Sequence, residues 1–142
     1  MLRLHFVFAI LIVFAMSGPA SAEELLIIAN PSVNVVLPLT MREIEAIYLL
    51  RITTWPDGSH IVPVNREVSS AVRAKFTVEA LQENNATLAA YWNEMHFQGK
   101  LPPVVQESEP AMLAFVQRVP GAIGYISAST AAEGVKVLSR VP

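Results

Sequence analysis

The chain has 142 residues, with 10 Lys and Arg against 12 Asp and Glu, and it contains no cysteine. This composition excludes a disulfide framework and cysteine-based zinc sites. The slightly acidic balance gives no indication of binding to nucleic acid or to an anionic membrane surface.

The first 22 residues have the three parts of a secretory signal peptide. Arg3 gives a positive start, residues 6–16 form an apolar run, and small residues at 20–22 form a cleavage site. The run is shorter than the ~20 residues that a membrane-spanning helix needs. We therefore expect cleavage after Ala22, one mature domain at 23–142 without a membrane span, and a periplasmic or secreted location.

The first elements of the mature chain are a strand and a well-marked helix. Residues 24–30 are apolar and partly β-branched, which predicts a buried strand. Thr40 and Glu43 form a capping-box signature, and Leu39 and Ile44 can form the hydrophobic staple around it. The buried stripe of this helix should contain Ile44, Ile47 and Tyr48.

A turn and a second strand follow this helix. Pro56 and Gly58 favour a turn at residues 53–59, where Gly58 can take a positive φ. Trp55 is expected to be a packing residue. Residues 60–65 predict a strand, and Pro63 indicates an edge position or a local irregularity within it.

Three further helices are predicted, at 69–81, from Asn84 or Asn85 to about residue 98, and from Ser108 onward. Pro110 near the start of the last helix is typical of a first turn. We expect their apolar stripes to be core faces; these are Val72/Phe76/Ala80, Leu88/Trp92/Met95 and Met112/Phe115/Val116.

The C-terminal part predicts two more strands, at 122–126 and 135–140, separated by a short helix or turn at 127–133. Gly124 within a strand indicates that a neighbouring group packs closely against it. Strands that alternate with helices predict an α/β layered domain with a mostly parallel sheet of four to five strands.

The sequence offers little to a catalytic or metal-site interpretation. His60 and His96 lack carboxylate partners at metal-binding spacing. Ser69 or Ser70 could be drawn into a triad with His60 and Asp57, but no nucleophile-elbow motif surrounds either serine. We expect no enzyme, no metal and no cofactor.

The strand-to-helix junction at residues 61–76 is the strongest candidate site. A helix N-terminus favours anions because its N–H groups are unpaired and its dipole end is positive. Ser69 and Ser70 could donate hydroxyl hydrogens there, Arg66 could add a bidentate contact, and Arg73 lies one turn further on. The simpler alternative is that a serine caps the helix and both arginines are solvated.

The order of motifs resembles the phosphate-binding components of ABC transporters, a family with the class II periplasmic-binding-protein fold. The resemblance rests on "LTMREIEAIYLLRITTWPDGSHIVPVNRE" at 39–67 and "LAFVQRVPGAIGYIS" at 113–127. It implies a three-layer α/β domain equivalent to one of the family's two lobes, and an oxyanion site at Arg66, Ser69, Ser70 and Arg73.

The chain departs from the family pattern in ways that bear on the ligand. After the arginine, the family has an Asp-Gly-Ser-Gly-Thr stretch, whereas this chain has Glu67, Val68, Ser69 and Ser70. The family's aspartate accepts a proton from bound phosphate, so its absence weakens the basis for selecting phosphate over sulfate. The first-lobe phosphate contacts and the Gly-Lys pair before the tryptophan are also missing.

Two functions follow from the resemblance. The first is an exported protein that binds phosphate or a similar oxyanion, like the solute-binding component of a phosphate transporter. The alternative is a ligand-free interaction or sensory module of the cell envelope built on one lobe. In either case, a protein partner or a homodimer could cover the face that the missing lobe would occupy.

Overall fold

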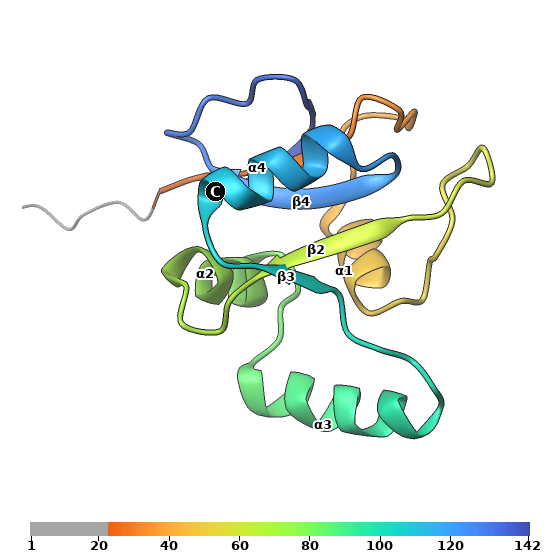
Figure 1. Cartoon of the computed structure of the whole chain (residues 1–142). Helices are drawn as coiled ribbons and strands as arrows, with labels where there is room; N and C mark the ends of the chain where they lie inside the picture. Colours follow the sequence, from red (N-terminus) through yellow and green to blue (C-terminus); the bar gives the residue numbers. More distant parts are fainter. Residues whose placement is uncertain (1–22) are drawn as a thin grey trace, which may run out of the picture.

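The computed structural model describes residues 23–142, so the expected signal peptide lies outside the described residues. None of the helices in this range combines the length and apolar character that a membrane span requires. In chain order the elements are β1 (Leu25–Ala29), α1 (Met41–Tyr48), β2 (Val62–Arg66), α2 (Ala71–Glu79), α3 (Asn85–Phe97), β3 (Val104–Gln106), α4 (Glu109–Arg118), β4 (Ala122–Ser127) and β5 (Lys136–Val141) (Figure 1).

The five strands form one sheet in the order β3-β2-β4-β1-β5. β2 is parallel to both β3 and β4, whereas β1 is antiparallel to both β4 and β5. Because β5 is antiparallel to β1, it points in the same direction as β4, and β1 is the reversed strand of the five. The predicted mostly parallel sheet is confirmed, and β3 is a short edge strand that the sequence pattern did not indicate.

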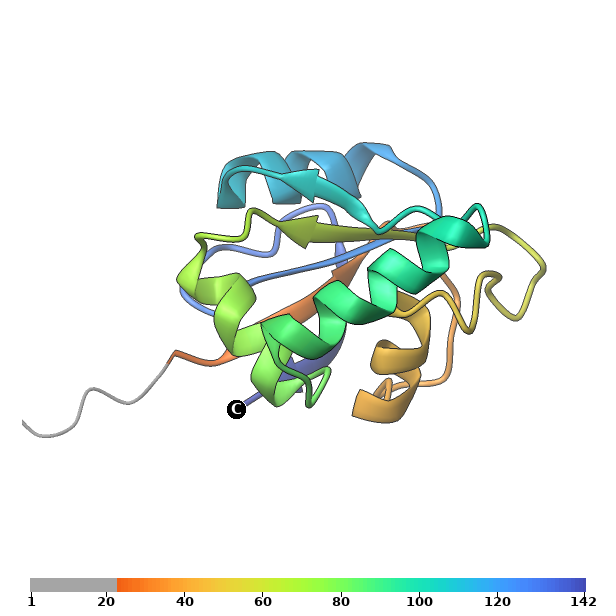
Figure 2. The ribbon, with the colours of Figure 1, turned by 90° about the horizontal axis from the view of Figure 1, so that it is seen from below.

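The sheet is the middle of three layers, with α4 on one face and α1 and α2 on the other (Figures 1 and 2). Successive residues of β1 point to opposite faces and serve both layers. Leu25, Ile27 and Ala29 belong to the core on the α1 and α2 side, and Leu26 and Ile28 belong to the core beneath α4. The three-layer single-lobe arrangement expected from the sequence is therefore confirmed.

Helix α1 begins as its sequence predicts. Thr40 has an extended backbone, its hydroxyl accepts from the Glu43 N–H, and the Glu43 carboxylate accepts from the Thr40 N–H at 2.8 Å. Ile44, Ile47 and Tyr48 are all buried against the sheet. Trp55 is also a packing residue, 3% exposed, and its indole N–H donates to the Gly121 carbonyl at 3.0 Å.

The edge position expected from Pro63 is wrong, because β2 lies inside the sheet. The local irregularity is present: β2 pairs with β4 at Val62 and Pro63, and with β3 from Val64 to Arg66. Pairing with β3 thus begins one residue after Pro63, so the missing N–H of the proline interrupts no pairing with β3.

Beyond Pro63, a tyrosine side chain replaces backbone pairing between β2 and β4. The Tyr48 hydroxyl lies 2.9 Å from the Val64 carbonyl and 3.2 Å from the Ile123 carbonyl, with good hydrogen-bond geometry to both. Tyr48 is fully buried, and its ring packs edge-on against Phe76 with the ring centroids 4.7 Å apart. Tyr48, a side chain of α1, therefore takes part in the hydrogen bonding of the sheet.

Helix α3 does not follow the expectation that its Leu88/Trp92/Met95 stripe is a core face. None of its residues is buried, and the helix lies outside the layer formed by α1 and α2 (Figures 1 and 2). Leu88 packs partly against the core, and the Tyr91 hydroxyl donates to the Leu49 carbonyl. The remaining apolar side chains of α3 are half-buried or exposed.

The C-terminal part largely follows its pattern. Met112 and Val116 of α4 are buried, and Phe115 packs against the same cluster. A Cβ on Gly124 would lie 2.5 Å from the Met112 sulfur, which explains the glycine in this strand. Ser127 still belongs to β4, and residues 128–133 form turns and irregular structure without a helix.

Candidate functional site

The candidate site lies where the parallel strands end. β2 ends at Arg66, β3 at Gln106 and β4 at Ser127, and these strands point in one direction. Helices α2 and α4 begin shortly after β2 and β3, so their amino ends lie near this edge. The carboxyl ends of strands in open α/β sheets are where ligands generally bind.

The start of α2 is capped by Ser70, one of the predicted site residues. Its side chain is nearly buried at 8% exposure, and its hydroxyl oxygen accepts from the Arg73 N–H at 3.2 Å. The first-turn N–H groups of Ala71 and Val72 have no partner within the helix. Ser69 precedes the cap and is exposed. The expectation that a serine caps this helix is thus confirmed.

Of the predicted site residues, Arg66 makes the most extensive side-chain contact within the protein. It is 8% exposed, and its Nε and Nη2 atoms each donate to a carboxylate oxygen of Glu67 at 2.9 Å. This bidentate contact raises the pKa of Arg66 and lowers the pKa of Glu67. The neighbouring carboxylate therefore occupies the edge of the guanidinium at which an oxyanion makes a paired contact.

Arg73 connects helix α2 to the end of β2. Its Nη1 atom donates to the Arg66 carbonyl at 2.6 Å, so its side chain folds back along the turn. Neither arginine is merely solvated, which corrects the simpler alternative derived from the sequence. Arg66, Ser70 and Arg73 lie together at one turn, although each has an intramolecular partner.

Tyr125 and Asn65, which the sequence did not indicate as site residues, also lie at this edge. The Tyr125 hydroxyl donates to the Asn65 side-chain oxygen and accepts from the Arg66 N–H at 3.2 Å. Its ring stacks on Phe76 with the centroids 3.9 Å apart. Burial raises the pKa of Tyr125, so its hydroxyl stays protonated as a donor. Tyr125 stands in the "PGAIGYIS" motif, but no spacing rule relates it to Arg66.

Acidic groups surround the same edge. Glu109, in the first turn of α4, accepts from the Ser127 N–H, and its charge also favours the cationic form of Arg66. Glu23 accepts from the Ser129 N–H at 2.9 Å. Hydrogen bonds from Ser127 and Ser129 lower the pKa of Glu23. The edge thus holds carboxylates beside the two arginines.

Within residues 23–142, every buried side-chain nitrogen and oxygen has a hydrogen-bond partner. The same range contains no group of three or more His, Asp or Glu residues arranged to hold a metal ion. The chemistry available at this edge is hydrogen-bond donation from backbone N–H groups and hydroxyls, with charge from Arg66. Such groups suit an oxyanion.

No protein-family model matches the sequence, and no curated protein matches it. Solved structures do match. A structure from Clostridium perfringens, described as a candidate phosphate ABC transporter substrate-binding protein with bound phosphate, superposes with a TM-score of 0.66 at 25% identity. An ABC-type phosphate transport receptor from Vibrio cholerae gives 0.64 at 24%, and PstS from Borrelia burgdorferi gives 0.62 at 18%.

Each match covers 82% of this chain but 44%, 45% and 47% of the three neighbours. The chain thus spans less than half the length of the proteins it resembles. It is similar in fold to phosphate ABC transporter substrate-binding proteins, and its partial coverage of them fits a single lobe.

Proposed function

We propose that this chain is an exported protein that binds phosphate or a similar oxyanion, and that it is not an enzyme. The observation that carries the proposal is the nearly buried guanidinium of Arg66 at the carboxyl end of β2, beside the amino end of α2. The fold shared with a protein described with bound phosphate supports this ligand class. The signal-like residues 1–22 support export to the periplasm or the medium.

In the proposed mode of binding, the anion lies at the start of α2. The N–H groups of Ala71 and Val72 point toward it, and the hydroxyls of Ser69 and Ser70 donate to it. The Ser70 oxygen already accepts from Arg73, but its hydrogen remains free to donate. Arg66 supplies charge, and Arg73 is the weakest member because it donates to the Arg66 carbonyl.

Glu67 is an internal competitor for this anion. Its carboxylate makes the same paired contact with Arg66 that a phosphate or sulfate would make. The anion must therefore displace Glu67 or use the remaining N–H groups of the guanidinium. A single lobe also leaves the ligand open to water and salt. We expect a dissociation constant on the order of millimolar, or ~−4 kcal/mol.

Phosphate and sulfate should compete on similar terms. The side chains around Arg66 that are negatively charged, Glu67 and Glu109, are each engaged by an internal donor. Glu67 follows the arginine directly, but the aspartate and the two glycines of the family pattern are missing. We therefore expect selectivity between the two anions of less than about tenfold, which is 1.4 kcal/mol.

The test is an NMR titration of residues 23–142 with phosphate and sulfate at low salt. Saturable shifts of the Ser69 to Arg73 amides are expected. Glu67→Gln should tighten binding by removing the competing charge, whereas Arg66→Lys should weaken it because lysine lacks the planar fork. Ser69→Ala, at an exposed position, should weaken binding without affecting the fold. Absence of any shift with either anion would refute the proposal.

The second candidate function, an interaction or sensory module, is favoured by helix α3. None of its residues is fully buried, and Phe97 at its end and Leu101 after it are 83% and 70% exposed. A protein partner or a second copy could bury them. Sedimentation velocity over a concentration series tests for the second copy: wild type should show concentration-dependent mass, and Phe97→Ser should reduce it. A monomer at all concentrations would exclude the homodimer.

A further inference from the structure

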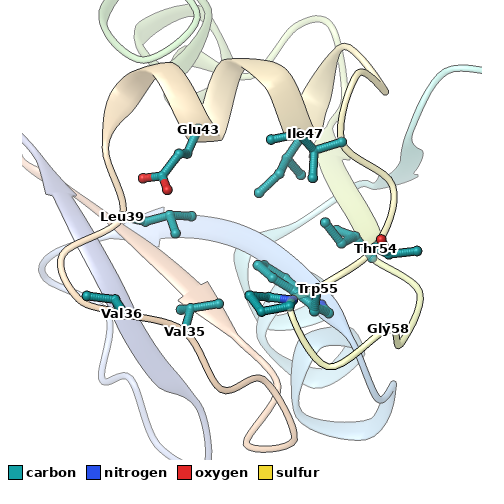
Figure 3. Close-up of a pocket in the computed structure, with 11 residues that line it drawn as sticks. Val35, Val36, Leu39, Glu43, Ile47, Thr54, Trp55 and Gly58 are labelled. Carbon is teal, nitrogen blue, oxygen red and sulfur yellow. The ribbon is translucent and has the colours of Figure 1, made fainter.

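A cavity of about 530 Å³ lies at the other end of the sheet from the candidate oxyanion site. It is open on one side and is lined by α1, by the segment before it, and by the loop that leads into β2 (Figure 3). Ile61 lines the cavity immediately before β2 begins, whereas Arg66 ends that strand. The cavity and the junction at Ser70 are therefore separate places on the molecule.

The size and lining of the cavity suit a small organic molecule. Ligand pockets for such molecules typically have volumes of about 300–1,000 Å³ and mostly apolar walls. The walls here include Leu39, Ile47 and Trp55, all of which are buried and held by the core. The Trp55 ring is further fixed by the hydrogen bond from its indole N–H to the Gly121 carbonyl.

The mouth of the cavity carries apolar side chains that face water. Val36 is 91% exposed and Ile52 is 41% exposed, and both line the cavity. An occupant that covers them removes apolar area from water, which is favourable at roughly 25 cal/mol per Å². The apolar contribution to binding is thus available without rearranging the core.

Glu43 is the charged residue among those that line the cavity. Figure 3 shows Glu43 and Ile47 projecting from the same side of α1. Both the Thr40 N–H and the Thr40 hydroxyl donate to its Oε2 atom at 2.8 Å, and no hydrogen bond to Oε1 occurs among the described residues. These hydrogen bonds hold the side chain in place and lower the pKa of Glu43, which keeps it ionised at neutral pH.

Glu43 lines the cavity but is itself exposed to solvent, so its fixed carboxylate favours one kind of head group over the others. An anionic ligand would be repelled, and a neutral ligand would remove water from the carboxylate without replacing its hydrogen bonds. A cationic group replaces that water with a charge-assisted hydrogen bond. We propose that this cavity is a second binding site, which takes a small molecule with an apolar body and a cationic head group.

Three probes that share a phenyl body test the head-group rule: 2-phenylethylamine, 2-phenylethanol and 3-phenylpropionate. The Trp92→Phe background leaves Trp55 as the tryptophan of the described chain, so its fluorescence reports on the cavity. The amine should bind saturably and roughly three- to fivefold more tightly than the alcohol, as expected for a partly exposed charge pair. The propionate should bind more weakly than the alcohol.

Three variants locate the binding. Glu43→Gln keeps an oxygen that can accept from Thr40 and removes the charge, so it should abolish the preference for the amine over the alcohol. Ile52→Ala should weaken the amine and the alcohol alike. Val36→Glu, at a position that is 91% exposed and therefore tolerant, should strengthen amine binding.

Three results would overturn the proposal: no saturable binding of any probe, equal affinity for the amine and the propionate, or an unchanged preference in Glu43→Gln. This inference does not depend on the proposed oxyanion function. Phosphate is followed at the Ser69 to Arg73 amides and the amine at Trp55, so failure of one site is distinguishable from failure of the other.

Discussion

Helices α1 and α3 begin alike and end up in different environments. In each, the side chain of the N-cap residue, Thr40 or Asn84, accepts from the backbone N–H three residues later. Both carry apolar residues at helical spacing. Yet α1, with 8 residues, buries Ile44, Ile47 and Tyr48, whereas α3, with 13 residues, buries none.

The difference lies in how the apolar residues are distributed around each helix. In α1 they form one stripe, and charged residues such as Arg42 and Glu45 occupy the rest of the surface. In α3, Tyr91, Trp92 and Met95 are joined by alanines on other sides, so no single face is marked for burial. Capping and spacing therefore predict that a helix forms, whereas segregation of polar residues predicts that it packs.

The largest expected effect separates the two helices by stability. Ile44→Ala should lower the free energy of unfolding by ~2–5 kcal/mol, because the fully buried side chain leaves a cavity. Met95→Ala in α3 should cost less than about 1 kcal/mol, since Met95 is only half-buried. Urea denaturation of both variants measures this. Equal losses would show that α3 is covered in solution.

Hydrogen exchange should sharpen the same contrast without substitutions. Amides in the middle of α1 should exchange only on global unfolding, whereas those of α3 should open locally. We expect α3 amides to exchange roughly tenfold faster or more, measured by NMR or mass spectrometry under native conditions. Equal protection of the two helices would contradict the assignment of α3 as a peripheral element.

The N-caps should differ in their effect on the whole domain. Thr40→Ala should cost ~1 kcal/mol of global stability, because α1 unfolds with the core. Asn84→Ala removes an equivalent hydrogen bond, but its cost should appear mainly as lower helicity of α3. Urea melts, together with the chemical shifts of residues 85–97, distinguish the two. A global loss as large for Asn84→Ala as for Thr40→Ala would break the comparison.

The smallest effect concerns pH. Hydrogen bonds from Thr40 lower the pKa of Glu43 in the folded state, so its contribution is present above the unfolded pKa. It is lost as the pH falls through the folded pKa. The stability difference between wild type and Glu43→Gln should therefore shrink between about pH 6 and pH 3 in urea melts. The first turn of α3 carries no acidic residue, so Asn84→Ala should show no such pH dependence.

The elements with strong local signals were predictable from the sequence. The capping box at Thr40, the apolar run of β1 and the cap at Ser108 each depend on residues close together in the chain. Strand β3 was not predictable, because it is short, follows Pro102 and Pro103, and has half-exposed valines that look like loop residues. It forms only because β2 offers it a parallel partner.

The candidate site was predictable in part for the same reason. Arg66, Ser70 and Arg73 are close together in the sequence, and their proximity in the structure follows from the strand-to-helix junction. Tyr125 and Glu109 reach Arg66 only through the sheet order, which the sequence does not state. The pairing of Arg66 with Glu67 was also missed, since adjacent residues of an extended strand point to opposite faces, whereas here a turn begins at Glu67.

The Tyr48 hydroxyl has a consequence for which residues position 48 can accept. The helical pattern of α1 asks only for a large apolar side chain there, and phenylalanine would satisfy it. The carbonyls of Val64 and Ile123, however, would then lose the single hydroxyl donor that they share. The residues tolerated at position 48 are therefore limited by strands β2 and β4, which separate beyond Pro63 and belong to a different layer. The helix that contains the tyrosine does not impose this limit.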